Sequence, residues 1–179
     1  MTENDASTGQ WIRAAVSQYE QPLTLYALRI TGDLERARDA VQETFLRLCS
    51  EDRVRMEDHL AEWLFSVCRS RAVDSHRKEK RMGVLMQTMT HARSSAEPSP
   101  HEVVENRESA TLAMETLGSL PANQQEVIRL KFQHGLSYRQ IASVTQLTVT
   151  NVGFLIHTGL KTIRQKMNVS EPRPVTSKQ

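Results

Sequence analysis

Residues 136–152 read LSYRQIASVTQLTVTNV, and this stretch decides how the C-terminal half of the chain folds. Ser137, with Gln140 three residues later, forms the capping box that opens a helix. A second capping residue, Thr148, precedes a longer apolar-periodic stretch that runs from Val149 to about Met167. A short helix, a tight turn over residues 145–147 and a longer helix are the pattern of a helix-turn-helix.

The second helix of such a unit lies in the major groove of DNA and presents its N-terminal side chains to the edges of the bases. In this chain those side chains are Thr148, Thr150, Asn151, Phe154 and His157. An Asn amide pairs with adenine through two hydrogen bonds, and apolar atoms contact the thymine methyl group. Arg139 and Lys161 are placed to contact phosphates, which position a protein without reading sequence. The alternative is a helical hairpin that matches the pattern without binding DNA.

Two further helices are expected before this unit. One runs from about Val104 to Thr116, and the next begins at Leu120-Pro121. We expect Pro121 at the first helical position, where a missing N–H is tolerated, and an end at Gly135. Ala142 is small enough to let neighbouring helices approach, and Val152 faces the core.

A segment rich in serine and proline divides the chain. It contains Pro98 and Pro100, which restrict their neighbours and remove backbone donors, so residues 83–104 read as a flexible linker. The linker separates an N-terminal domain at residues 8–82 from a C-terminal domain at residues 105–168, and residues 169–179 form a tail. The fold class is all-α, with two small helical domains.

The N-terminal domain has three expected helices. Trp11–Ile30 contains Pro22 as a possible kink or break, and Asp33 caps the next helix. After a mixed loop at residues 50–58, a third helix starts near Leu60. The buried stripe expected on the second helix consists of Leu34, Ala37, Val41, Phe45 and Leu48. The opposite, charged face consists of Arg36, Asp39, Gln42, Glu43 and Arg47.

Charge is unevenly distributed although the net charge is only +2. Residues 33–43 hold four acidic and two basic side chains, whereas residues 69–81 hold six basic and two acidic ones. An acidic face and a separate basic stripe suit two different partners. Taken alone, each is also what a solvated helix surface looks like.

Several classes of protein are excluded. No apolar run approaches the roughly 20 residues that span a bilayer, and the polar N-terminus lacks a signal peptide. The six histidines form no metal-ligand pair, and neither a phosphate-binding glycine loop nor a nucleophile elbow occurs. We therefore expect a cytoplasmic, non-catalytic protein without cofactor, metal or membrane insertion. Cys49 and Cys68 are expected to be reduced, buried thiols.

A family resemblance joins these features. DAVQETFLR at residues 39–47, WLFSVCRSRAVD at residues 63–74, and Leu120-Pro121 through Ala142 occur in the order of regions two and four of extracytoplasmic-function sigma factors. The match covers nearly the whole chain apart from the linker and both tails. It implies a specificity subunit that brings bacterial core RNA polymerase to promoter DNA.

The resemblance also implies roles for individual residues. The face that would bind the clamp coiled coil of the polymerase β′ subunit consists of Asp39, Gln42, Glu43 and Arg47. The loop at residues 50–62 would capture a flipped base of the −10 element. The residues that would hold the melted strand are Trp63, Arg69, Arg71, Arg77 and Lys78. The helix-turn-helix would read the −35 element and contact the β flap, and an anti-sigma factor is a further candidate partner.

This chain departs from the family at the recognition helix. It has Gly153, Leu155 and Thr158 where Lys or Arg is usual, and Gln146 where the turn usually has Gly. If Gln146 is left-handed, its conformation costs roughly 1 kcal/mol relative to Gly. Each lost phosphate contact would make the slope of the logarithm of the DNA-binding constant against the logarithm of salt concentration less steep by about 0.9.

Two other function classes remain. An autonomous helix-turn-helix regulator with a helical dimerisation or sensor domain would account for the C-terminal half alone. An enzyme is the least supported class, because no catalytic motif is present.

Overall fold

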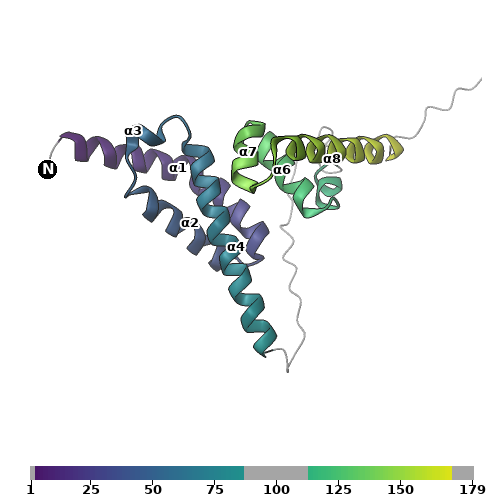
Figure 1. Cartoon of the computed structure of the whole chain (residues 1–179), viewed down its shortest axis with the longest axis horizontal. Coiled ribbons are helices and arrows are strands. Elements are labelled where there is room, and N and C mark those ends of the chain that lie inside the picture. Colours follow the sequence, from purple (N-terminus) through teal and green to yellow (C-terminus); the bar gives the residue numbers. More distant parts are fainter. Residues whose placement is uncertain (1–2, 87–112, 171–179) are drawn as a thin grey trace, which may run out of the picture. The chain divides into compact units, whose positions relative to one another are not determined.

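The computed structural model describes residues 3–86 and 113–170, and every element in these ranges is a helix (Figure 1). The expected all-α fold is confirmed. Most of the expected linker, the first part of the helix expected from Val104, and the last nine residues of the tail lie outside the described residues. The chain forms two compact units: an N-terminal unit with α1 to α4, and a C-terminal unit with α6, α8 and most of α7.

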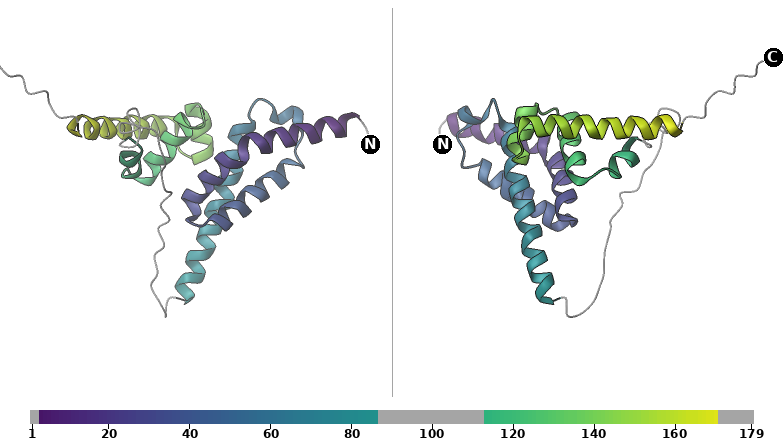
Figure 2. Two further views of the ribbon diagram at one scale, coloured as in Figure 1. Left: turned by 180° about the vertical axis from the view of Figure 1, so that it is seen from behind. Right: turned by 45° about the vertical axis from the view of Figure 1, so that its right-hand side comes forward.

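Three long helices, α1 (Glu3–Thr31), α2 (Leu34–Leu48) and α4 (Leu60–Met86), pack against one another in the N-terminal unit (Figures 1 and 2). α1 continues through Pro22 without a break, and it starts earlier than expected. α4 extends to Met86, so its last turn occupies the start of the expected linker. The final turns of α4 project past the ends of α1 and α2.

The core of this unit lies between the three helices. Leu23, Leu64 and Cys68 are fully buried, and the rings of Tyr26 and Phe65 meet edge to face with centroids 5.2 Å apart. On the described part of α4, Leu64, Phe65, Cys68 and Ala72 are buried. Leu60, Val67 and Val73, which the apolar spacing of the sequence also favours for the core, are only partly covered. The buried face of α4 is therefore rotated slightly from the one that the sequence pattern suggests.

The expected stripe on α2 is mostly correct. Ala37, Val41 and Leu48 are buried, and Phe45 is partly buried. Leu34 is 42% exposed, so its assignment to the core was wrong. Leu34 is the first residue of α2, and helical side chains lean toward the N-terminus, so this one points past the end of the helix.

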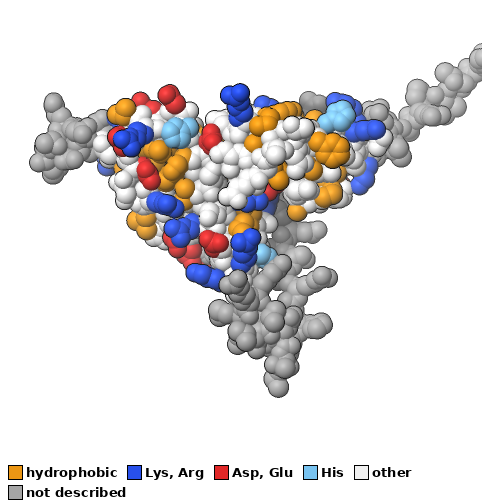
Figure 3. All heavy atoms as spheres, viewed as in Figure 1, with side chains coloured by type: hydrophobic (Ala, Val, Ile, Leu, Met, Phe, Trp, Pro, Cys, Tyr) orange, Lys and Arg blue, Asp and Glu red, His pale blue; other side chains and the backbone are white. Residues whose placement is uncertain are grey.

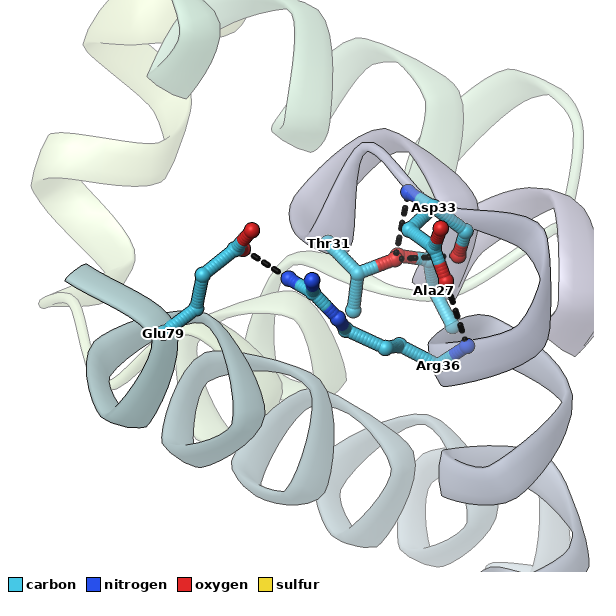
Figure 4. A network of polar contacts seen from close by, with 5 residues as sticks. All are labelled: Ala27, Thr31, Asp33, Arg36 and Glu79. Atoms are coloured by element: carbon cyan, nitrogen blue, oxygen red, sulfur yellow. Dashed lines mark hydrogen bonds and ion pairs between the residues drawn. The ribbon is translucent and has the colours of Figure 1, made fainter. Parts of the chain in front are cut away.

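A polar network joins the three helices where α1 turns into α2 (Figure 4). Gly32 has φ +70° and its N–H donates to Leu28 O, which ends α1. The Asp33 carboxylate then accepts a hydrogen bond from the Arg36 N–H at 2.9 Å and caps α2, as expected. The guanidinium of Arg36 forms an ion pair with Glu79 of α4. The turn after α1, the cap of α2 and the helix α4 are thus held together.

The C-terminal unit begins with helical residues 113–118, followed by α6 (Ala122–Phe132), α7 (Tyr138–Thr145) and α8 (Val149–Ser170). Pro121 is the N-cap of α6 rather than its first helical residue, so the helix begins one residue later than expected. α6 ends at Phe132, and Gly135, with φ +70°, lies in the turn that follows.

α6 and α8 approach each other closely at Gly159. A Cβ atom at this position would lie 2.6 Å from Ile128 Cδ1 and 3.3 Å from Leu120 Cδ1. Val127, Leu130 and Val152 are fully buried. The absence of a side chain at Gly159 therefore lets the second helix of the helix-turn-helix rest directly on α6.

The turn between α7 and α8 is built by local hydrogen bonds. Both bonds of the Ser137–Gln140 capping box are present, at 2.8 and 3.3 Å, and Thr148 Oγ1 accepts from the Asn151 N–H at 3.2 Å. Between the two caps, Gln146 adopts φ 58° and ψ 33°. The expected helix-turn-helix is confirmed, and the structure shows that Gln146 is the left-handed residue of its turn.

Replacing Gln146 with glycine should stabilise the C-terminal unit. We expect Gln146→Gly to raise the free energy of opening of this unit by about 0.5–1 kcal/mol, because glycine adopts φ 58° without a Cβ clash. Native-state hydrogen exchange of α7 and α8 amides measures this free energy. The matched control is Gln165→Gly on the exposed face of α8, which should lower it by about 1 kcal/mol. A loss of stability at Gln146→Gly would contradict the strain that we assign to this turn.

Candidate functional site

The four residues of the expected polymerase-binding face lie on one exposed side of α2. Asp39, Gln42, Glu43 and Arg47 are all exposed, whereas Ala40, Val41 and Thr44 between them are buried. The face combines two carboxylates with an amide and one guanidinium. It can therefore accept hydrogen bonds from basic side chains of a protein partner and donate others.

Glu43 on this face contacts Arg71 of α4. Glu43 Oε2 lies 3.3 Å from Arg71 Nε, and the side chains are 56% and 43% exposed. From the sequence these residues were expected to contact two different partners, and the fold makes them neighbours. A pair this exposed contributes at most about 1 kcal/mol, so a partner with better geometry can replace it.

The remaining residues expected to hold a melted strand lie along α4. Trp63 and Arg69 are partly buried, whereas Arg77 and Lys78 are exposed near the projecting end of the helix. Basic and acidic side chains are interspersed over the N-terminal unit on the face drawn in Figure 3. The cations of α4 at positions 69, 71, 77 and 78 are thus spread along and around one helix.

The loop between α2 and α4 contains a short helix, α3 (Arg53–Met56), which the sequence did not indicate. Asp52 caps it by accepting from the Val54 N–H at 3.0 Å, and Val54 is 82% exposed. An open hollow of about 410 Å³ lies beside it. The residues that line this hollow are Thr8, Glu51, Asp52, Arg53, Val54 and Glu57. Thr8 comes from α1, far away in sequence, so no local pattern could have included it.

The expected DNA-reading residues are exposed at the start of α8. Thr148, Thr150, Asn151, Phe154 and His157 all reach solvent, as do Arg139 on α7 and Lys161 on α8. Val152 is fully buried, as expected. Leu155 is only 7% exposed, so it belongs to the core face with Val152 and Ile156. Position 155 therefore faces the core, and the departures from the family pattern outside the core are Gly153 and Thr158.

The two cysteines differ in environment. Cys49 is exposed, so its expected burial was wrong: it is the C-cap of α2, beyond the packed part of the helix. Cys68 is buried, and burial raises the pKa of its thiol to about 12, partly offset by a hydrogen bond with Thr44. Unfolding would let this thiol ionise at its ordinary pKa near 9.0, so its contribution to stability is lost as the pH rises from 9 toward 12.

No group of His, Cys, Asp and Glu residues that could hold a metal ion occurs among the described residues. Within residues 3–86 and 113–170, no helix has the length and apolar character needed to cross a bilayer.

Each of the two units matches a known protein family model. Residues 15–82 match the family model of sigma-70 region 2, and residues 111–163 match that of sigma-70 region 4. Together the two matches cover about two thirds of the chain.

This chain belongs to the sigma-70 family, as a sigma factor of the extracytoplasmic-function type. It is an RNA polymerase sigma factor. An autonomous regulator is not favoured, because the N-terminal unit is a sigma region rather than an unrelated sensor domain.

Individual relatives agree with this assignment. The chain is 29% identical to the ECF RNA polymerase sigma factor SigL of Mycobacterium tuberculosis, over 89% of this chain and 90% of the relative. It is 28% identical to the ECF RNA polymerase sigma factor SigM of Bacillus subtilis, over 74% of this chain and 80% of the relative. The fold is similar to that of the sigma factor RpoE from Bartonella quintana, solved in complex with the anti-sigma factor NepR. The TM-score is 0.61 at 18% identity, covering 89% of this chain and 98% of that chain.

The Glu43–Arg71 pair should be weak. A double-mutant cycle with Glu43→Gln and Arg71→Gln should give a coupling energy of about 0.2–1 kcal/mol by chemical denaturation, followed through the fluorescence of Trp11 and Trp63. The same cycle on Arg36 and Glu79 serves as a comparison on the same two helices. A Glu43–Arg71 coupling well above 1 kcal/mol would mean that the pair is structural and not available to partners.

Thiol labelling should distinguish the two cysteines. We expect one thiol of the native protein to react rapidly with a disulfide reagent at pH 8, and the second to react only on unfolding, because Cys68 is buried with a pKa of about 12. Cys49→Ser should leave the native protein unreactive. Fast labelling of native Cys49→Ser would contradict the burial of Cys68.

Proposed function

We propose that the two units divide the work of promoter recognition. The N-terminal unit binds the β′ clamp coiled coil of core RNA polymerase and the melted −10 strand. The C-terminal unit binds the −35 element and contacts the β flap. The observation that carries this proposal is that each family match falls on a helical unit whose exposed face presents the expected residues.

On α2, the polymerase-binding residues are Asp39, Gln42, Glu43 and Arg47. On α4, Trp63, Arg69, Arg77 and Lys78 hold the single strand, since stacking and cationic contacts to phosphates are how proteins bind unpaired strands. Arg71 belongs to the same group, and its neighbour Glu43 places polymerase contact and strand contact next to each other.

The protein acts by differential binding and catalyses no reaction. It binds melted promoter DNA better than duplex, and the polymerase performs the chemistry. We infer a cytoplasmic location, where core polymerase and the chromosome are found. An anti-sigma factor is a further proposed partner, supported by the complex of the structurally similar Bartonella quintana protein with NepR.

Charge reversal on α2 should separate polymerase binding from folding. Asp39→Lys together with Glu43→Lys should abolish holoenzyme formation with core polymerase, measured by fluorescence anisotropy of the labelled protein, because both exposed carboxylates would be lost from the docking face. The matched control is Glu20→Lys, an exposed reversal on α1, which should bind normally.

A circular-dichroism spectrum unchanged by the double reversal would show that the fold is intact. Normal holoenzyme formation by the double variant would contradict the assignment of this face. Failure of the unmodified protein to form a holoenzyme, or to start transcription from any genomic promoter, would contradict the proposed function as a whole.

A further inference from the structure

The surface of the helix-turn-helix is unusual in its charge. Residues 140–160 contain no Lys, Arg, Asp or Glu, so the whole stretch from within α7 to the middle of α8 is uncharged apart from His157. Arg139 and Lys161 stand at its two ends. The part of α8 that a helix-turn-helix inserts in the major groove therefore offers neutral side chains.

The fold determines which of these side chains are available. Val152, Leu155 and Ile156 are buried on the core side of α8. Phe154 is 65% exposed and Val149 is 45% exposed, and Asn151 and Thr150 are exposed beside them. On the face drawn in Figure 3, apolar side chains reach the surface over the C-terminal unit.

This composition has a consequence for base reading. The commonest reader of guanine in the major groove is an Arg or Lys that donates two hydrogen bonds to its O6 and N7 atoms. The first three turns of α8 contain neither residue. Asn is the corresponding reader of adenine, and apolar side chains contact the methyl group of thymine. The Asn151 backbone N–H is bonded to Thr148 Oγ1, which fixes the start of the helix, and the side-chain amide is exposed.

We propose that this sigma factor reads A·T base pairs in its upstream promoter element, with Asn151 contacting adenine and Phe154 contacting a thymine methyl group. The inference rests on the proposed function and adds the class of sequence that α8 recognises. A protein partner fits the same surface less well. The polar Thr150 and Asn151 lie between the apolar Val149 and Phe154, whereas the edge of an A·T pair presents both polar atoms and a methyl group.

Selection from a promoter library tests the sequence class. The reconstituted holoenzyme would be selected on DNA with a fixed −10 region and a randomised upstream element. We expect A·T pairs at the enriched upstream positions. Enrichment of guanine on either strand at two or more of these positions would overturn the inference while leaving the sigma-factor function intact. A holoenzyme that does not form, or starts no transcription, would instead count against the proposed function.

Single-atom changes in the DNA test the two side chains. Replacing the contacted thymine with uracil removes only a methyl group, and should weaken wild-type holoenzyme binding about fourfold, from about 0.8 kcal/mol per buried methyl-sized group. Phe154→Ala should bind more weakly and lose this discrimination. Replacing the contacted adenine with 7-deazaadenine should affect the wild type but not Asn151→Ala. The matched control is Gln165→Ala, an exposed change further along α8 that should keep both penalties.

The contrary outcomes are distinct. An unchanged uracil penalty in Phe154→Ala would show that Phe154 does not contact thymine. Equal weakening on every upstream sequence, or a defect in holoenzyme formation without DNA, would indicate that Phe154 contacts protein instead.

A gain of function completes the test. Gly153 is partly exposed, and a Cβ there would lie 3.6 Å from Tyr138 Cε2, an ordinary contact distance, so a longer side chain fits. Gly153→Arg should therefore introduce a guanine preference at one selected position. If the variant binds upstream DNA but keeps the wild-type selection, position 153 does not face the bases and the proposed orientation of α8 is wrong.

Discussion

The chain can end one helix and turn sharply into the next within a few residues if one residue leaves the right-handed region of backbone conformation. The last carbonyls of the first helix must still find hydrogen-bond donors. Three turns of this protein meet that constraint with a single left-handed residue each: Gly32, Gly135 and Gln146. Glycine adopts this conformation readily, whereas Gln146 does so at a cost. The caps that follow, Asp33, Ser137 and Thr148, begin the next helix at once. Which faces of α2, α7 and α8 meet the core depends on these turns.

The two units present different kinds of surface. α2 and α4 carry charged side chains, joined by the Arg36–Glu79 and Glu43–Arg71 ion pairs, over a core of aliphatic and aromatic residues. α8 begins with three turns that carry no Lys or Arg. Salt screens exposed charges but has little effect on apolar contacts and neutral hydrogen bonds. Where α8 itself meets DNA through these turns, its contacts would therefore depend little on salt, whereas those of Arg139 and Lys161 at their ends would depend on it.

Much of the fold could be predicted because the decisive interactions are local. The capping box at Ser137 and the cap at Asp33 each involve residues within four positions of one another, and both predictions were correct. The exposed residues of α2 and of the start of α8 followed from helical periodicity. The predictions failed at helix ends, where helical periodicity says little about whether a side chain is buried by neighbouring helices. Leu34 and Cys49 are exposed, and Pro121 is a cap.

Local sequence patterns are enough to predict the class of fold, the two helical units and the exposed faces of α2 and of the start of α8, because capping and periodicity act over a few residues. Which side chains from distant segments meet becomes known from the packed fold alone. It paired Glu43 with Arg71, brought Thr8 to the loop around α3, buried Leu155 and rested α8 on α6 at Gly159. These contacts depend on how helices cross, which is set by packing of whole faces and is not encoded in any short stretch of residues.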